Sequence, residues 1–411
     1  MERKLYKTVL SQLNRKEYLI ITGARQVGKT TILKQLSLYL KDHREVHYNV
    51  TFENPEILNA VNDHPGNILK YIGLEPLAQK GNSVTKVTLL IDEVQNAENP
   101  SNFLKYHYDL NGDWLKIIAT GSSAFYLDTK FKDSLAGRKR IFELFPLDFE
   151  EFLQFKGYPE YIIEWEKMRQ SMGYTSLSHR ELFILFDEYL TFGGYPAVIL
   201  ENDPEEKKEI LRDLVKTYLK RDVLDSNQSD YLKIIQLLNV LANQTGQLLN
   251  THELSNTLKF ASATIENYLY ILQKCYHLHL VRPFYKSLRK ELSKMPKIYF
   301  QDLGFRNALL NHWQPGPQRL DKGQHIENYL FIRLRQLYGQ DYIRYWRTSS
   351  GNEIDFIVSV DQSKEFAMEA KFKADAIQLS KYKIFTNAYP AIPIRMVAYE
   401  STNPVCSLIR L

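Results

Sequence analysis

Hydrophobic and polar positions follow two alternating patterns over the first 145 residues. Short, largely apolar runs at 18–21, 87–91 and 116–120 are typical of strands buried inside a sheet, and a further strand is predicted at 46–50. The segments between them, such as 30–40, have the character of helices. Strands that alternate with helices predict the α/β class, a mostly parallel sheet with helices on both faces.

Beyond Pro146 the pattern becomes mainly helical. Helices are predicted over 148–217, with an interruption at 193–196, and again over 230–282. After Tyr299 the composition is mixed, and 351–360 and 365–371 are predicted to be paired strands. The sequence therefore predicts three parts, listed here in order: an α/β domain at 1–147, a helical middle at 148–300, and a small α/β domain at 301–411.

Composition narrows the class of protein. The chain has 411 residues, too many for one hydrophobic core, with 44% hydrophobic and 25% charged residues. A net charge of +5 permits a nucleic-acid partner without arguing for one. The two cysteines, Cys275 and Cys406, form neither a disulfide framework nor a metal site. A charged start and the lack of a long uncharged apolar run lead us to expect a cytoplasmic protein without a membrane partner.

The loop after the first predicted strand has a phosphate-binding pattern. Residues 23–30 fit G-x-x-x-x-G-K-[ST], with a buried strand before the loop and a helix after it. Glycines let the backbone N–H groups face phosphates at the start of the helix, where the helix dipole is positive. Lys29 reaches the β- and γ-phosphates, and the Thr30 hydroxyl ligates Mg²⁺. ATP and Mg²⁺ are thus the predicted cofactors, with contacts from Gly23, Ala24, Arg25, Gln26, Val27, Gly28, Lys29, Thr30 and Thr31.

A second motif closes the strand predicted at 87–91. The apolar strand delivers Asp92 to the carboxyl end of the sheet, where its carboxylate can hold Mg²⁺ through water. Glu93 follows and can polarise the attacking water. A strand ending in a solvated acidic turn is the alternative. The position of the motif after a phosphate-binding loop in an α/β sheet favours the catalytic interpretation.

Two further residues are candidates at this site. Ser122 lies in the turn 120–123 after the fourth predicted strand, where a polar side chain can contact the γ-phosphate or position water. A plain turn is the alternative. Arg138 is a candidate to supply positive charge to the transition state, including that of a nucleotide bound to a neighbouring subunit. A surface arginine in a solvated salt bridge is the alternative reading of Arg138.

These motifs together resemble a known family. The segments are GARQVGKT at 23–30, LIDEVQ at 90–95, TGSS at 120–123, AGR at 136–138 and FPL at 145–147. They resemble prokaryotic AAA-type ATPases of the AAA_14 class, in which a domain of the DUF4143 class follows. The resemblance continues through YLKRD at 218–222 and PKIYFQD at 296–302, so it covers nearly the whole chain. It implies an ATPase domain with a DUF4143 domain after it.

The middle of the chain has the outline of a winged helix-turn-helix. Helices are predicted to start at His252 and Ser262, and 280–285 is predicted to be a β-wing. Between 281 and 300 there are six Lys or Arg residues against one acidic residue, interleaved with aromatic residues (Phe284, Tyr285, Tyr299 and Phe300). This mixture suits contact with a phosphate backbone, so DNA is a predicted partner. A helical domain for protein contacts, with a solvated basic rim, is the alternative.

The predicted strand pair near the C-terminus carries a second candidate site. Its first strand contains Asp355, and its second places Glu369 and Lys371 on one face. If the register sets Asp355 beside Glu369, the two carboxylates can hold a divalent metal, and Lys371 can orient or deprotonate the attacking water. Taken alone, a Glu and a Lys at this spacing are also common on the solvent face of a strand.

A D…E-x-K arrangement across two strands resembles the PD-(D/E)xK nuclease core of restriction-endonuclease-like folds. Glu327 lies in the helix predicted before the strands, where such folds often place an extra acidic metal ligand. Gln378 and Tyr382 resemble the Q-x-x-x-Y motif of the RecB-like branch. The resemblance implies a nuclease-like fold and a metal set of Glu327, Asp355 and Glu369. A nuclease-like fold is weaker evidence for nuclease activity than for architecture.

The leading hypothesis is an ATP-hydrolysing AAA-type protein that couples nucleotide state to a DNA-contacting, nuclease-like C-terminal domain. The alternative is a nucleotide-dependent switch that binds DNA or protein and cuts nothing. A small-molecule kinase is the weakest hypothesis, because it leaves the final hundred residues without a role. A second copy of the chain or another protein is left open as a further partner.

Overall fold

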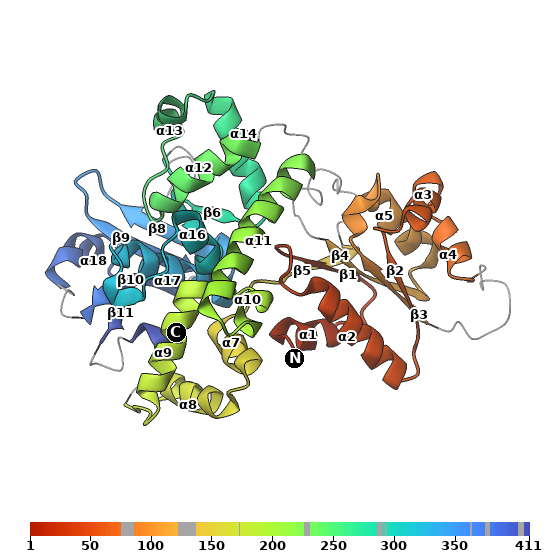
Figure 1. Cartoon of the computed structure of the whole chain (residues 1–411), viewed down its shortest axis with the longest axis horizontal. Coiled ribbons are helices and arrows are strands. Elements are labelled where there is room, and N and C mark those ends of the chain that lie inside the picture. Colours follow the sequence, from red (N-terminus) through yellow and green to blue (C-terminus); the bar gives the residue numbers. More distant parts are fainter. Residues whose placement is uncertain are drawn as a thin grey trace. The chain divides into compact units, whose positions relative to one another are not determined.

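The computed structural model describes residues 1–74, 86–121, 137–171, 173–225, 231–285, 291, 294–361, 364–374, 379–401 and 407–411. These residues form two compact units (Figure 1). The first unit contains residues 1–145 together with 274–276, and the second contains 146–273 and 277–411.

The first unit is built on a five-stranded sheet in which every neighbouring pair is parallel. The order is β2-β3-β4-β1-β5, for β1 (Tyr18–Thr22), β2 (Val46–Thr51), β3 (Val87–Asp92), β4 (Leu115–Gly121) and β5 (Lys139–Glu143). The four predicted strands and the parallel sheet are confirmed. Strand β5 was not predicted, because it lies at the sheet edge and its partly exposed sequence KRIFE lacks an apolar run.

Helices cover both faces of this sheet (Figure 1). Tyr18 and Ile20 of β1 pack in one buried cluster with residues of α3 (Pro55–Asp63), α4 (Asn67–Tyr71) and α5 (Pro100–Asn111). Leu19 and Ile21 are buried on the opposite face, since successive side chains of a strand point to opposite sides. Helix α2 (Lys29–Asp42) runs along that face, and α1 (Lys4–Leu10) lies beside α2.

The second unit begins as a helical region. Its helices are α7 (Phe149–Lys156), α8 (Pro159–Gln170), α9 (His179–Phe192), α10 (Pro196–Leu200), α11 (Pro204–Asp225), α12 (Tyr231–Asn243), α13 (Thr251–Leu258) and α14 (Ser262–Lys274). Strands β6 (Leu278–Val281) and β7 (Lys297–Phe300) then pair antiparallel. Two helices joined by a short turn and followed by a strand pair have the predicted order, and the winged-helix assignment stays a prediction.

The last part of the second unit is a four-stranded sheet of order β11-β10-β9-β8. Its strands are β8 (Ile343–Arg347), β9 (Glu353–Ser359), β10 (Glu365–Lys373) and β11 (Ile394–Glu400), and only β10 and β11 are parallel. Helix α16 (Leu303–Leu310) precedes α17 (Lys322–Tyr338), which packs on the sheet, while α18 (Lys383–Ala388) lies between β10 and β11 in the chain. The predicted pairing of the strands near 351–360 and 365–371 is found as β9 and β10.

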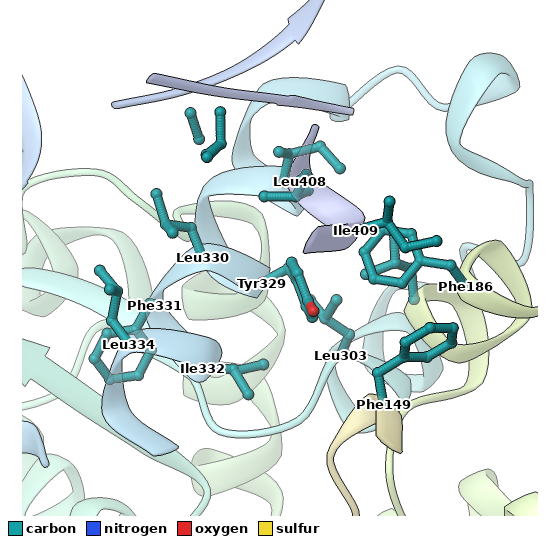
Figure 2. Packing of buried hydrophobic residues seen from close by; sticks show 14 of the residues in the cluster. Phe149, Phe186, Leu303, Tyr329, Leu330, Phe331, Ile332, Leu334, Leu408 and Ile409 are labelled. Atoms are coloured by element: carbon teal, nitrogen blue, oxygen red, sulfur yellow. The ribbon is translucent and has the colours of Figure 1, made fainter. Parts of the chain in front are cut away.

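One buried hydrophobic cluster connects the helical region to the final sheet (Figure 2). Phe149 and Phe186 come from α7 and α9, while Tyr329 and Leu330 come from α17. Ile409, from a short turn near the C-terminus, packs in the same cluster. The boundary predicted near residue 300 falls inside this unit, and the division into three domains stays a prediction.

None of the helices in the described ranges has both the length and the apolar character that crossing a bilayer requires. Cys275 is buried, and Cys406 lies outside the described residues.

Candidate functional site

Two glycines shape the loop between β1 and α2. Gly23 has φ 145°, and a Cβ atom there would lie 2.2 Å from the carbonyl oxygen of Leu144. Gly28 has φ 102° and caps the N-terminus of α2. Both conformations favour glycine, so the predicted pattern has a geometric cause. Of the other predicted loop contacts, Ala24 and Val27 are buried, Arg25 is half-buried, and Gln26, Thr30 and Thr31 are exposed.

The lysine of the loop is buried and turned back onto the loop. Its Nζ donates to the carbonyl oxygens of Gly23, at 2.9 Å, and Ala24, at 2.7 Å. Both acceptors are neutral, whereas a nucleotide would offer charged phosphate oxygens, which form stronger hydrogen bonds. The Lys29 ammonium therefore lies against the loop that is predicted to bind phosphate. A bound nucleotide would replace these carbonyl partners by phosphate oxygens.

The predicted magnesium residues meet at the carboxyl end of the sheet. The Thr30 hydroxyl donates to Oδ2 of Asp92 at 2.8 Å, and the Thr120 hydroxyl donates to Oδ1. Two oxygens at right angles around Mg²⁺, each about 2.1 Å from the ion, are about 3 Å apart. The spacing of Thr30 and Asp92 therefore fits Mg²⁺, with the hydroxyl as a ligand and the carboxylate acting directly or through water.

Glu93 follows β3 in a left-handed conformation, with φ 56°. Its N–H donates to the Thr120 hydroxyl at 3.1 Å, and its carboxylate accepts a hydrogen bond from Gln95. A non-glycine residue in this region costs of order 1 kcal/mol and persists only where its surroundings hold it. The contacts from Thr120 and Gln95 supply that support and orient the carboxylate.

Thr120 is a site residue that the sequence analysis did not select. The motif 120–123 was noticed, but Ser122 was chosen, and Ser122 lies outside the described residues. Strand β4 lies between β1 and β3, so its last polar side chain is placed against Asp92. Knowledge of this strand order would have identified Thr120.

Arg138 forms an ion pair within the first unit. Its Nε lies 2.9 Å from Oδ1 of Asp109, and its guanidinium lies 5.8 Å from the centre of the Tyr108 ring. Both charged side chains are partly exposed. This is the surface salt bridge that was the alternative for Arg138, and its role toward a neighbouring copy stays a prediction.

Arg3 contacts the phosphate-binding loop and was not predicted. Its side chain is buried, and Nη1 donates to the carbonyl oxygen of Val27 at 2.5 Å while Nη2 donates to that of Phe145 at 2.7 Å. It therefore ties the loop to the segment after β5. In the sequence it is one charge in a charged start, so no signal marked it.

The predicted carboxylate pair of the second unit is found side by side. Met368 pairs with Phe356, so the same register sets Glu369 opposite Asp355. The Asp355 N–H donates to Oε2 of Glu369 at 3.1 Å, and the Ala370 N–H donates to Oδ2 of Asp355 at 2.8 Å. Both carboxylates are buried. The structure thus brings together two predicted metal ligands from neighbouring strands.

Lys371 and Tyr382 both bind Glu369. The Lys371 ammonium and the Tyr382 hydroxyl donate to its Oε1, the latter at 3.0 Å. Burial raises the pKa of Asp355 well above its usual range, and the nearby Glu369 and Glu327 raise it further. Burial also raises the pKa of Glu369, against the opposing effect of Lys371. The raised carboxyl pKa is expected where acidic groups share a buried site.

A second group of carboxylates lies next to this pair. Oxygens of Glu327, Glu353 and Asp355 lie within 4.8 Å of one another. The Lys297 ammonium, from β7, contacts Oε1 of Glu327 at 2.9 Å and Oε1 of Glu353. The Tyr299 hydroxyl donates to the same oxygen of Glu327 at 2.6 Å. The predicted approach of Glu327 to Asp355 is therefore found.

Three members of this group were missed from the sequence. Glu353 lies two residues before Asp355, so period-two alternation could have placed it on the same face. Lys297 and Tyr299 have the same spacing on β7 but gave no signal of pairing with Glu327. Gln378 lies outside the described residues, and Tyr382 ends a short 3₁₀ turn (Leu379–Tyr382) before α18.

The basic, aromatic run at 281–300 is only partly accessible. Lys297, Tyr299 and Phe300 are at most 1% exposed, because β7 is packed inside the second unit. The inference that these side chains contact a phosphate backbone is therefore wrong. Arg282 and Lys294 are exposed, and Lys286, Arg289 and Lys290 lie outside the described residues.

Comparisons with protein families divide the chain into three matches. Residues 15–153 match an AAA domain, AAA_14. Residues 184–315 match DUF8612 and residues 322–406 match DUF4143, both described as domains of unknown function.

Several curated proteins are similar to this chain. An uncharacterized protein of Methanocaldococcus jannaschii is 28% identical over 346 residues, which cover 82% of this chain and 71% of that protein. A second uncharacterized protein of the same organism is 28% identical over 308 residues, covering 72% of this chain but only 63% of that protein. An uncharacterized protein of Haemophilus influenzae is 25% identical over 368 residues, covering 87% of this chain and 83% of that protein.

Solved structures with some likeness to the chain include PCH-2 of C. elegans, at 15% identity and a TM-score of 0.33 over 53% of this chain and 63% of that one. AMPPCP-bound DnaA from Aquifex aeolicus has 16% identity and a TM-score of 0.30 over 67% of this chain and 88% of that one. Scores this low carry no inference about this chain. The family matches, together with the loop and parallel sheet of the first unit, support an AAA-type P-loop ATPase with a C-terminal DUF4143 domain.

Proposed function

We propose that this chain binds and hydrolyses ATP with Mg²⁺, and that it couples the nucleotide state to a DNA-contacting, nuclease-like site in the second unit. ATP hydrolysis is supported by three hydrogen bonds that connect Thr30 to Asp92, Asp92 to Thr120, and Thr120 to Glu93. These contacts place a hydroxyl, a carboxylate and a second carboxylate beside a loop shaped for phosphate.

Each of these residues has a distinct task. The loop N–H groups and Lys29 bind the phosphates, while Thr30 and Asp92 are the residues that would hold Mg²⁺. Mg²⁺, when bound, neutralises charge on the β- and γ-phosphates. Glu93 accepts a hydrogen bond from the attacking water and orients it. Thr120 fixes both Asp92 and Glu93 through one hydroxyl.

Two substitutions separate binding from hydrolysis. Lys29→Ala should abolish ATP binding in a titration with a fluorescent ATP analogue, because the phosphates lose their lysine partner. Glu93→Gln should keep binding and slow phosphate release by about 100-fold or more. Lys34→Ala changes an exposed lysine of the same helix and should behave like the natural chain. Unchanged affinity in the Lys29 variant would show that the site is wrongly assigned.

The nuclease-like part of the proposal is supported by the adjacency of Asp355, Glu369 and Lys371 on β9 and β10. The two carboxylates are the residues that would hold a divalent ion, which would activate water and polarise a phosphodiester. Burial alone would lower the pKa of Lys371, but Asp355 and Glu369 outweigh it and raise this pKa. The raised pKa favours a charged Lys371, which suits it to orient water or phosphate beside the two carboxylates.

Nicking of supercoiled plasmid DNA tests this part. The natural chain should nick in Mg²⁺ or Mn²⁺, and Asp355→Asn should not. Asp341→Asn, at an exposed aspartate of the same unit, is the matched control. If the natural chain hydrolyses ATP but never cuts DNA, the nucleotide-dependent switch replaces the nuclease. A change in ATP hydrolysis on addition of DNA would support coupling in either case.

A further inference from the structure

The second unit contains a buried lysine that the proposed chemistry does not use. Lys297 is 1% exposed, and its ammonium is held between Glu327 of α17 and Glu353 of β9. A buried ammonium is strongly destabilising unless carboxylates and hydrogen bonds compensate it. The two glutamates provide that compensation, so the three side chains form one group of mutually paired charges.

This ammonium lies where carboxylate oxygens gather closely enough to hold a metal. Oxygens of Glu327, Glu353 and Asp355 lie within 4.8 Å of one another, and Lys297 contacts two of these three side chains. Oε1 of Glu327 also accepts the Tyr299 hydroxyl at 2.6 Å. A divalent ion at the same place would face the ammonium and would have to break these contacts.

The second oxygen of Glu353 is also occupied. Its Oε2 lies 3.0 Å from Nη1 of Arg347, a partly exposed arginine of β8. Glu353 therefore has one cationic partner on each carboxylate oxygen. The carboxylates of Glu327 and Glu353 are therefore both paired with cationic side chains in this conformation.

Asp355 is arranged differently. Its Oδ2 accepts the Ala370 N–H, and within the described part of the chain Oδ1 accepts no hydrogen bond. Glu369 lies beside it on β10, and its Oε2 accepts the Asp355 N–H. Its Oε1 is paired with Lys371, whose side chain is 30% exposed and can move toward solvent, unlike the buried Lys297. We expect an ion between Asp355 and Glu369 to displace the partly exposed Lys371, while Lys297 keeps its contacts with Glu327 and Glu353.

We propose that Lys297 is the permanent cation of the Glu327 and Glu353 pair, so that the second unit takes one divalent ion, at Asp355 and Glu369, and not two. This inference rests on the proposed metal-dependent site of the second unit. It changes the predicted metal set, because Glu327 becomes a partner of Lys297 instead of a metal ligand.

Counting bound Mn²⁺ tests the inference without any activity assay. The full chain carrying Asp92→Asn, which removes a metal residue of the first unit, is titrated with Mn²⁺ in the absence of nucleotide, and free Mn²⁺ is followed by electron paramagnetic resonance. We expect one bound ion per chain. Asp355→Asn in the same background should bind none, and Lys294→Met, at an exposed lysine three residues before Lys297, should still bind one.

The decisive variants change the lysine and its partner. Lys297→Met should bind a second Mn²⁺, because Glu327 and Glu353 then lack their resident cation, and Lys297→Arg should still bind one. If Lys297→Met does not fold, Glu327→Gln tests the same point, since loss of a carboxylate that holds no ion should leave the count at one.

The outcomes distinguish this inference from the function on which it rests. Two ions in the Asp92→Asn chain, or loss of an ion in Glu327→Gln, would overturn the role of Lys297 and leave the metal site standing. A folded Lys297→Met chain that still binds one ion would also overturn it. No bound ion in the Asp92→Asn chain would overturn both the inference and the metal-dependent nuclease, while ATP hydrolysis would be tested separately by Lys29→Ala.

Discussion

Replacement of Gly23 by alanine should disable the nucleotide site through a single methyl group. The new Cβ would lie 2.2 Å from the Leu144 carbonyl oxygen, a contact so short that the loop and the segment after β5 must separate by about 1 Å. Gly23 also has φ 145°, a conformation that strains any other residue. Strain of about 1–3 kcal/mol from the backbone and a similar cost of overpacking give a loss of about 3 kcal/mol in stability.

The same displacement should reach the chemistry. The Gly23 carbonyl is one of the two acceptors of the Lys29 ammonium, so a shift of the loop moves the lysine that serves the phosphates. A misplacement of about 1 Å can cost about 100-fold in rate, and we expect a loss of that order in kcat/KM for ATP hydrolysis. Steady-state phosphate release measures it, and titration with a fluorescent ATP analogue gives the change in affinity.

Gly137→Ala is the matched control for Gly23→Ala. Gly137 belongs to the same unit and has φ +72°, but apart from its chain neighbours no heavy atom of the described residues lies within 4 Å of the added Cβ. Strain of about 1 kcal/mol should lower the melting temperature slightly and leave ATP binding unchanged. If Gly23→Ala binds and hydrolyses ATP as well as Gly137→Ala does, the close contact with Leu144 does not shape the site.

Three other predictions concern side chains of the first unit. Thr120→Val should lower kcat for ATP hydrolysis by about 10-fold with little change in ATP affinity, because Asp92 loses a donor and the Glu93 N–H loses an acceptor; equal kcat would contradict the role of Thr120. Burial lowers the pKa of His107 to about 4 from 6.5, so its stabilisation, present above pH 6.5, should be lost as pH falls through 4, by about 3 kcal/mol. Hydrogen exchange of the sheet amides should show this loss between pH 7.5 and 4.5, and His107→Gln should abolish it. Arg138→Ala should change the free energy of unfolding by less than about 1 kcal/mol. If Arg138 acts on the nucleotide of a neighbouring copy, ATP turnover per chain should rise with protein concentration, and the substitution should remove that rise.

The interior strands were predictable because a strand buried on both faces has a largely apolar sequence. Strands β1, β3 and β4 have neighbours on both sides and helices on both faces, so nearly every side chain in them is apolar. Among the described strands β5 pairs only with β1, and it carries Lys139, Arg140 and Glu143 in five residues. Pairing along an edge comes from backbone hydrogen bonds, which leave no mark in the side chains.

The candidate sites were predictable where the ligands are close in sequence or in a fixed periodic relation. The loop at 23–30 and the pair Asp92 and Glu93 are local motifs, and alternation along β10 set Glu369 and Lys371 on one side. Thr120 was missed because its role depends on the order of the strands, and Arg3 was missed because it reaches the loop from a distant part of the chain.

Lys297 shows the physical limit of reading charge from sequence. A lysine in a basic run is expected to reach the surface, and the run at 281–300 was interpreted as a contact for a phosphate backbone, with a solvated rim as the alternative. Its burial depends on Glu327 and Glu353, which lie far along the chain and belong to different elements. Tertiary partners therefore decide whether a cationic side chain is exposed or buried. A count of charges over a short stretch of sequence does not show those partners.

Lys29 and Lys297, the two buried lysines of the candidate sites, differ in what they bind, and this difference predicts how each responds to a ligand. Lys29 donates to two backbone carbonyls, which are neutral acceptors, so a triphosphate with its negative oxygens can replace them readily. Lys297 contacts two carboxylates, and separation of those pairs would leave buried charges without partners. The first site is therefore suited to repeated exchange of its ligand. At the second site we expect Lys297 to remain in place and the proposed ion to enter beside Asp355 and Glu369.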